Sequence, residues 1–252
     1  MCDDLTAADD AALMSRRDIG LLAAGAGLAL LIPSAANALP VRASTVSITT
    51  PDGVCDAYFV HPAKGKHPAV LIWPDIKGLR PAFELMGKRL AEAGYAVLVI
   101  NPFYRVAKAP VVGPNDDFQM PAVRAKLMPM AQALSAKTTE IDAAAFVHWL
   151  DAQRGVDKKR KIGTIGYCMG GPMTFHTAAL LPERIGAIGS FHGGGLATDK
   201  PDSPHHLVSK MKASALIAIA DNDNQRDPGA KLALRSAFDA ANLPAEIEVY
   251  TG

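Results

Sequence analysis

Short apolar runs alternate along the chain with longer stretches that have helical spacing. Runs such as 69–73 and 185–191 are typical of strands buried on both faces of a parallel sheet. Stretches such as 82–93 place their apolar residues on one helical face. This alternation predicts an α/β fold with a doubly wound, mostly parallel sheet and helices on both faces. We expect strands at 45–50, 55–61, 69–73, 95–100, 161–165, 185–191, 215–220 and 246–250, and helices at 82–93, 138–151, 203–211 and 228–241.

One stretch, residues 105–134, does not fit the alternation. Pro110, Pro114 and Pro121 interrupt it, and it shows no clear strand pattern. Because it follows the carboxyl end of a strand, it would lie near the crevice where such sheets bind ligands. Two interpretations stay open: a lid or pocket wall, or a surface excursion that ends in an ordinary core helix.

The amino terminus has the pattern of an export signal. Arg16 and Arg17 precede an apolar stretch at 19–32, and residues 36–38 (Ala-Asn-Ala) offer a cleavage site. The apolar run is shorter than the about 20 residues that span a bilayer. We therefore expect a twin-arginine type signal peptide at 1–38, transient contact with export machinery and no stable membrane anchor after signal removal. A single domain at 39–252 would then be periplasmic or secreted in a bacterium.

The composition is that of a globular protein without a strongly charged partner. Of the 252 residues, 49% are hydrophobic and 20% are charged, and the net charge of +1 gives no reason to expect nucleic-acid binding. Three cysteines with no CxxC pair and no Cys/His cluster predict neither a disulfide framework nor a metal site. No cofactor is expected.

The strongest chemical signal is the sequence Gly-Tyr-Cys-Met-Gly-Gly at 166–171. It follows the apolar run at 161–165 and has the Gly-x-Cys-x-Gly form of a nucleophile elbow, in which a strand turns sharply into a helix. A side chain at Gly166 or Gly170 would collide with neighbouring backbone in such a turn. Cys168 would face the positive end of a helix, which favours the thiolate. The alternative is a buried structural cysteine in a glycine-rich turn.

On these residues the chain resembles the dienelactone hydrolase family of α/β-hydrolases. The resemblance rests on the elbow at 166–171, supported by 73–78, 101–105 and 221–223, and it runs from Val46 to the last residue. It implies a Cys-His-Asp triad and hydrolysis of a carboxylic ester or lactone, with a small molecule of that class as the partner. The thiolate would form an acyl-enzyme that water then cleaves.

The resemblance also implies roles for individual residues. Cys168 would be the nucleophile, and Asp223 rather than Asp221 would be the triad acid, in a loop after a later strand. Asp75 stands where the family carries a glutamate that interacts with the thiol, and it is shorter by one methylene.

Further implied roles concern the substrate. The backbone N–H groups of Ile76 and Met169 match the oxyanion-hole positions. Arg105 lies near the position of an arginine for an anionic substrate group, although a surface arginine is the alternative.

The triad histidine has no counterpart at its expected place. In this fold it follows the last strand, here 246–250, and the sequence to Gly252 has no histidine there. His192 lies at a strand end near the crevice. We expect it to line the pocket or to be a loop histidine with hydrogen bonds inside the protein, and not to act as a general base. The chain as given is therefore expected to be a weak or inactive hydrolase unless it continues past Gly252.

The alternatives to a hydrolase are a non-catalytic small-ligand-binding protein and, less favoured, a thiol redox protein. The histidines are His61, His67, His148, His176, His192, His205 and His206.

Overall fold

A computed structural model describes residues 38–250 of the chain. The predicted signal peptide lies outside this range except for its last residue, so its structure is not described. No helix within the described range is both long enough and apolar enough to cross a membrane.

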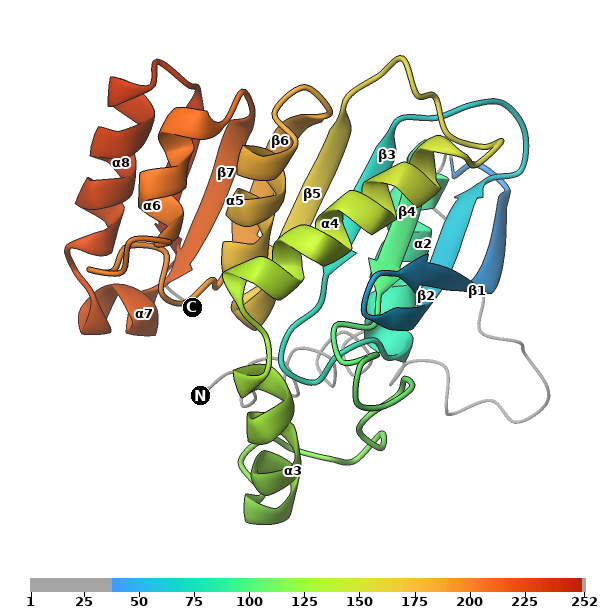
Figure 1. Cartoon of the computed structure of the whole chain (residues 1–252), viewed down its shortest axis with the longest axis horizontal. Helices are drawn as coiled ribbons and strands as arrows, with labels where there is room; N and C mark the ends of the chain where they lie inside the picture. Colours follow the sequence, from blue (N-terminus) through green and yellow to red (C-terminus); the bar gives the residue numbers. More distant parts are fainter. Residues whose placement is uncertain (1–37, 251–252) are drawn as a thin grey trace, which may run out of the picture.

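One eight-stranded sheet organises the fold, in the order β1-β2-β4-β3-β5-β6-β7-β8 (Figure 1). β1 pairs antiparallel with β2, and β2 with β4, whereas the remaining neighbours are parallel. The mostly parallel sheet predicted from the apolar runs is therefore confirmed. The strands are β1 Val41–Thr50, β2 Gly53–Pro62, β3 Ala69–Trp73, β4 Ala96–Ile100, β5 Ile162–Tyr167, β6 Ile185–Phe191, β7 Ser214–Ala220 and β8 Ala245–Tyr250.

Helices cover both faces of this sheet. Successive residues of a strand point to opposite faces, and the apolar side chains on each face pack against helices. Leu71 packs into the core that holds Phe146 of α4 and Phe175 of α5, whereas Ile72 packs with Phe83 of α2 on the other face. Figure 1 shows α4, α5, α6 and α8 in front of the sheet and α2 behind it. The helices are α2 Pro81–Glu92, α3 Pro121–Gln132, α4 Ala136–Asp151, α5 Gly171–Leu180, α6 Pro204–Leu207, α7 Asp221–Arg226 and α8 Ala230–Ala240, with short 3₁₀ turns at Cys168–Gly170 and Val208–Lys210.

The order of strands fixes where a site can form. After β3 the chain forms β4 on one side of β3. It then continues through α3 and α4 and forms β5 on the other side of β3. Ligands bind at such a switch point, beyond the carboxyl ends of the strands. At this edge Asp75 follows β3, Cys168 follows β5, and His192 follows β6.

Residues 105–134 form a packed unit beside this edge. It contains α3, which projects below the sheet in Figure 1. A small apolar group, the insert cluster, holds the unit together, and Ile76 and Met169 pack against it. The insert thus contacts the loops that follow β3 and β5. The insert cluster consists of Phe103, Val111, Val112, Val123 and Leu127.

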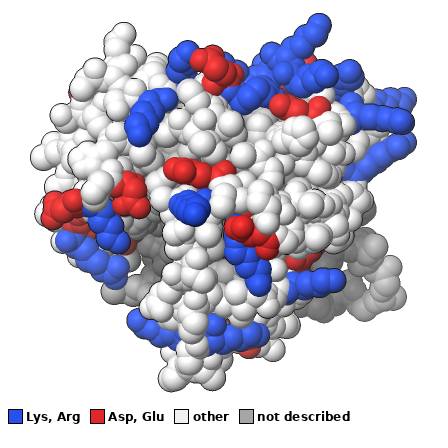
Figure 2. All heavy atoms as spheres, in the orientation of Figure 1, with Lys and Arg blue, Asp and Glu red and all other residues white. Residues whose placement is uncertain are grey.

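Charges of both signs are mixed over the face seen in Figure 2, with basic side chains most dense at its upper right. The exposed Lys64, Lys66, Lys158 and Lys159 belong to the loops that precede β3 and β5. These loops lie at the amino ends of the strands. These four lysines are therefore at the edge of the sheet opposite to Cys168.

Candidate active site

Cys168 stands at the turn between β5 and α5 with a left-handed backbone, at φ 50°. Such a conformation costs a non-glycine residue about 1–3 kcal/mol and is retained where the surroundings enforce it. The side chain is half-buried, and the sulfur forms no disulfide. The structure thus has the strained strand-to-helix turn that the motif predicts.

Three glycines allow this turn to form. A Cβ on Gly166 would lie 2.0 Å from the carbonyl oxygen of Gly170, and a Cβ on Gly170 would lie 2.2 Å from the carbonyl oxygen of Trp73. A Cβ on Gly171 would stand 2.7 Å from the Cα of Gly193, in the loop after β6. The predicted collisions at Gly166 and Gly170 are confirmed, and the elbow lies in tight contact with both neighbouring strand ends.

The loop after β6 brings His192 to Asp223. His192 also has a left-handed backbone, at φ 54°, and its N–H donates to the carbonyl of Ala218 on β7 (2.9 Å). Its Nδ1 lies 2.5 Å from Oδ2 of Asp223. The sequence predicted a pocket-lining histidine or an ordinary loop histidine at this position, and the structure pairs His192 with the predicted triad acid.

The two candidate acids have different partners. Asp223 lies in the first turn of α7 rather than in a loop, and its side chain is 19% exposed. Its Oδ1 is 3.7 Å from Nη1 of Arg226 on the same helix. Asp221 instead accepts a hydrogen bond from Nε2 of Gln225 (2.6 Å). Of these two aspartates, Asp223 is the one that lies against a histidine.

Asp75 is held by an arginine that sequence analysis did not identify. Nη1 and Nη2 of Arg80 donate to Oδ1 and Oδ2 of Asp75 at 2.7 and 2.9 Å, and the N–H of Lys77 donates to Oδ1 (2.9 Å). The guanidinium of Arg80 lies 4.9 Å from the ring centroid of Phe83 in α2. This bidentate ion pair between Arg80 and Asp75 fixes the turn after β3. The predicted interaction of Asp75 with the thiol stays a prediction.

Ile76 and Met169, the predicted oxyanion-hole residues, lie on adjacent segments. Trp73 and Gly166 are register partners on β3 and β5, so the turns that follow them leave the sheet side by side. Both side chains pack against the insert cluster. The backbone N–H groups of these residues therefore belong to the same edge as Cys168.

The guanidinium of Arg105 is paired with two carboxylates. Its guanidinium donates to Oδ2 of Asp52 in the β1–β2 turn (2.7 Å) and to both carboxylate oxygens of Asp142 in α4 (2.8 and 2.9 Å). Burial lowers the pKa of Arg105, but the hydrogen bonds to Asp142 and Asp52 raise that pKa overall. Arg105 thus ties the start of the insert to the hairpin and α4, and its predicted role toward an anionic substrate group stays a prediction.

Asp142 is the buried partner in this network. Its side chain is 3% exposed, and it also accepts a hydrogen bond from the hydroxyl of Tyr104 (2.7 Å). Burial raises the pKa of Asp142, and the hydrogen bonds from Arg105 and Tyr104 offset only part of that effect. The network is a structural one, built from charges that are largely removed from water.

Cys55 differs sharply from Cys168. It is buried in β2, and its thiol donates weakly to the carbonyls of Asp56 and Asn101. Burial raises the pKa of this thiol, so it stays protonated and unreactive. Among residues 38–250, no group of three or more His, Cys, Asp or Glu side chains is arranged to hold a metal ion.

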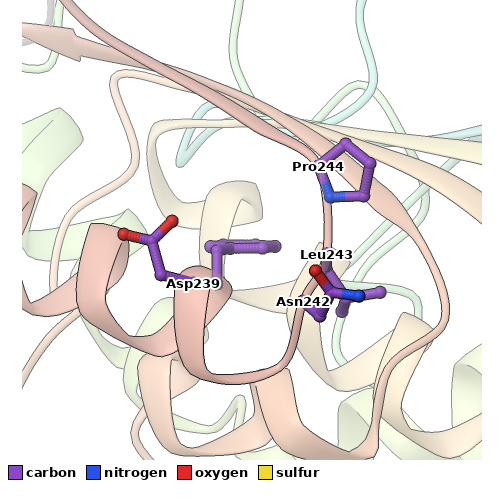
Figure 3. Close-up of a pocket in the computed structure, with 5 residues that line it drawn as sticks. Asp239, Asn242, Leu243 and Pro244 are labelled. Atoms are coloured by element: carbon purple, nitrogen blue, oxygen red, sulfur yellow. The ribbon is translucent and has the colours of Figure 1, made fainter.

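A hollow of about 310 Å³ lies elsewhere on the molecule, between the end of α8 and the start of β8 (Figure 3). Because β8 runs parallel to β7, this hollow is at the amino ends of the strands. Cys168 is at their carboxyl ends, so the hollow is not part of the candidate active site. Its lining residues are Phe238, Asp239, Asn242, Leu243 and Pro244.

Comparisons with known proteins agree with the geometry. The chain is 27% identical over 218 residues to a Salmonella typhi protein described as "Putative carboxymethylenebutenolidase", covering 83% of this chain and 76% of that protein. It is 28% identical over 184 residues to the carboxymethylenebutenolidase of Pseudomonas sp. (strain P51), covering 73% and 72%. The fold matches a crystal structure described as "Putative Dienelactone Hydrolase" from Klebsiella pneumoniae, with a TM-score of 0.69, 23% identity and coverage of 84% and 85%. The sequence model of the dienelactone hydrolase family matches residues 55–252. This chain therefore belongs to the dienelactone hydrolase family.

Proposed function

We propose that the chain hydrolyses a carboxylic ester or lactone with the thiolate of Cys168 as nucleophile. Membership of the family and the likeness to carboxymethylenebutenolidases support a hydrolase of this type. The observation that carries the choice of nucleophile is the left-handed Cys168 at the end of β5. A purely structural cysteine gives no reason to retain such a strained turn at the carboxyl end of a central strand.

The reaction has two steps. Sγ attacks the carbonyl carbon, and the carbonyl π electrons move to oxygen, where backbone N–H groups of Ile76 and Met169 would stabilise the charge. The intermediate collapses to a thioester, and the alkoxide leaves with a proton; in a lactone it stays tethered to the acyl group. Water then gives up a proton, attacks the thioester and expels the thiolate.

Both steps need a general base that accepts and returns a proton. The sequence contains no histidine after His206, so the position after β8 that the family resemblance implies offers none up to Gly252. Without a base, about 10³-fold or more of the rate is lost in related triads. The base in this proposal is therefore a group other than a histidine of residues 207–252.

The insert at 105–134 serves as a wall of the substrate site in this proposal. Its cluster contacts Ile76 and Met169, the two residues whose N–H groups would meet the developing oxyanion. A substrate bound at Cys168 would therefore approach the insert as well.

The main test compares the wild type with Cys168→Ala on an activated phenyl ester and on an enol-lactone. We expect the Ala variant to lose all activity above background, and mass spectrometry of the quenched wild type to show one acyl group on the peptide with Cys168. Cys55→Ala is the matched control and should keep the wild-type rate.

Two outcomes contradict the proposal. If Cys168→Ala is as fast as the wild type, Cys168 is not the nucleophile. If neither form turns over while calorimetry shows that both bind the lactone, the chain is a ligand-binding protein on a hydrolase fold.

The localisation is a second proposal: export through the pair Arg16-Arg17. A twin-arginine signal depends on this pair, so Arg16→Lys with Arg17→Lys should retain the protein in the cytoplasm of an expressing bacterium. Cell fractionation measures this directly. Equal periplasmic amounts of the wild type and the double variant would refute export through a twin-arginine signal.

A further inference from the structure

We propose that the edge of the sheet opposite to Cys168 is a docking surface for a bilayer of anionic phospholipids. Its main feature, which we call the basic edge, is a group of cationic side chains in the loops that precede β3 and β5. Both loops run along the top of the sheet in Figure 1. The proposal concerns where the protein binds and is independent of the proposed hydrolysis. The basic edge consists of Lys64, Lys66, Arg154, Lys158, Lys159 and Arg160.

Positive charge is concentrated at the basic edge although the net charge of the whole chain is only +1. Residues 62–68 and 153–161 contain seven lysines and arginines and one acidic residue, Asp157. All six side chains of the basic edge are exposed, and within residues 38–250 none of them forms an ion pair. A local excess of cations therefore lies at one edge of a nearly neutral protein.

The acidic groups at this edge do not offset the excess. Oδ1 of Asp157 accepts a hydrogen bond from the N–H of Lys159 (3.1 Å), so this carboxylate stabilises the turn before β5. The acidic side chains near the ends of α2 and α4 and before β6 each have another cation as partner. These pairs are Glu92 with Lys88, Asp151 with Arg184, and Glu183 with Lys212. The cations of the basic edge are therefore available to an external anion.

The two loops that carry these cations are held together as one surface. The N–H of His67 donates to the carbonyl of Gly155 (2.9 Å), and the N–H of Asp157 donates to the carbonyl of His67 (2.8 Å). The ring of His67 also lies between two carbonyl oxygens, with Nε2 2.8 Å from that of Lys64 and Nδ1 3.0 Å from that of Gly94. The backbones that carry the charges are thus fixed relative to one another before a partner binds, which lowers the entropic cost of binding.

Exposed apolar side chains at the same edge favour a lipid bilayer over a purely ionic partner. Leu39 precedes β1, Tyr95 precedes β4, and Leu180 ends α5, and these side chains are 41%, 40% and 40% exposed. Tyrosine and leucine beside lysines are typical of surfaces that lie on a membrane, where the cations meet phosphates and the apolar groups enter the headgroup region. The phosphates of a nucleic acid would use the cations alone.

The amino-terminal connection of the domain lies at this edge as well. The N–H of Leu39 donates to the carbonyl of Glu92 at the end of α2. Residues 33–37 separate the described chain from the apolar stretch at 19–32, and five residues span at most about 18 Å. When that stretch occupies a bilayer, the basic edge is therefore the part of the domain nearest to the lipid headgroups.

This orientation keeps the candidate active site in the aqueous phase. β5 has six residues, so its carboxyl end lies about 20 Å from the basic edge. The Debye length at physiological ionic strength is about 8 Å. The charge of the lipid surface is therefore screened at Cys168, and docking leaves the chemistry there unchanged.

Co-sedimentation of the full chain with vesicles tests the proposal. Vesicles that contain phosphatidylglycerol and phosphatidylcholine in equal amounts are compared with vesicles of phosphatidylcholine alone. The apolar stretch at 19–32 can insert into both kinds, so the measured quantity is the ratio of the two affinities. We expect a ratio of about 10² or more at low salt that falls about tenfold or more at high salt, because salt screens the attraction.

Charge variants locate the interaction. The variant with Lys158→Gln, Lys159→Gln and Arg160→Gln should bind the anionic vesicles about 10²-fold more weakly, since each basic side chain near an anionic surface contributes about fivefold. The control carries Lys126→Gln, Lys137→Gln and Lys200→Gln. It loses three exposed lysines at the opposite edge of the sheet and should bind within about twofold of the wild type.

Three results would overturn the proposal. They are equal affinity for the two kinds of vesicle, unchanged affinity of the variant at 158–160, and tighter binding to a DNA duplex than to the anionic vesicles. The third would make the basic edge a nucleic-acid surface. Both triple variants should hydrolyse a soluble ester at the wild-type rate, so failure of this proposal is distinct from failure of the proposed hydrolysis.

Alkylation of the nucleophile tests the orientation. Iodoacetamide should label Cys168 as fast in vesicle-bound protein as in free protein, because this edge faces away from the bilayer. Labelling that slows about tenfold or more on anionic vesicles would mean that the carboxyl edge docks instead, and would overturn the assignment of the basic edge.

Discussion

The carbonyl oxygen of Trp73 lies 2.2 Å from the point that a Cβ on Gly170 would occupy. β3 and the nucleophile turn are therefore in backbone contact, with no room for a methyl group. Trp73 itself is buried against Phe146 of α4, so the strand end cannot easily retreat. The position of Cys168 depends on this contact.

Gly170→Ala is expected to lower the free energy of unfolding by about 3 kcal/mol or more, because an atom must displace buried backbone. Ester hydrolysis should fall as well, since the turn that carries Cys168 has to shift. Urea unfolding and the initial rate measure the two effects. Gly194→Ala is the control, because a Cβ there meets nothing within 4 Å. Equal stability of both variants would show that the turn is loosely packed.

Arg105→Met is expected to lower the free energy of unfolding by about 3 kcal/mol, because it leaves the buried Asp142 without its cation. The ratio of KM values for an anionic and a neutral ester should stay the same, since the guanidinium is engaged by Asp52 and Asp142. Arg42→Met, at an exposed site on β1, is the control for loss of an arginine. A selective rise in KM for the anionic ester would instead support the substrate-binding role.

Asp142→Asn is expected to cost more stability at low pH than at neutral pH. Burial raises the pKa of Asp142 above its unfolded value, so the folded state binds the proton more tightly. Wild-type stability from this group therefore grows as the pH falls through the folded pKa, and the Asn variant lacks that gain. Urea unfolding of both proteins at several pH values between 7 and about 4 gives the difference. A smaller cost at low pH would mean that the pairing with Arg105 outweighs burial.

Leu127→Ala tests the insert as a wall of the site. Leu127 is fully buried in the insert cluster, so its truncation should lower the free energy of unfolding by about 2–3 kcal/mol. Because Ile76 and Met169 pack on the same cluster, we also expect a higher KM for the ester. Lys126→Ala, on the exposed side of α3, should change neither. An unchanged KM in Leu127→Ala would favour the interpretation of the insert as a surface excursion that does not contact the substrate.

The sheet was largely predictable because its central strands are continuous apolar runs. The predicted strands at 69–73 and 185–191 match β3 and β6. β1 begins at Val41, earlier than expected, because this edge strand exposes Arg42 and Ser44 and carries little apolar signal. The short helix α7 was missed for a similar reason, since none of its residues is buried.

The candidate site was predictable only where it is local in sequence. The elbow at Cys168 has a motif of its own, whereas the partners of Asp75, Arg105 and Asp223 come from other elements. No spacing in the sequence indicates that Arg105 meets Asp142 or that His192 meets Asp223. Those pairings follow from strand order and register, which become visible only in the folded chain.

The left-handed backbone at Cys168 has a conformational cost that glycine at this position would avoid. Glycine adopts such a conformation without steric penalty, so Cys168→Gly should be more stable than Cys168→Ala by about 1 kcal/mol. A library selected for thermal endurance alone would therefore accumulate glycine at this position and lose the proposed nucleophile. Retention of the cysteine under such selection would show that its side chain contributes packing to the fold.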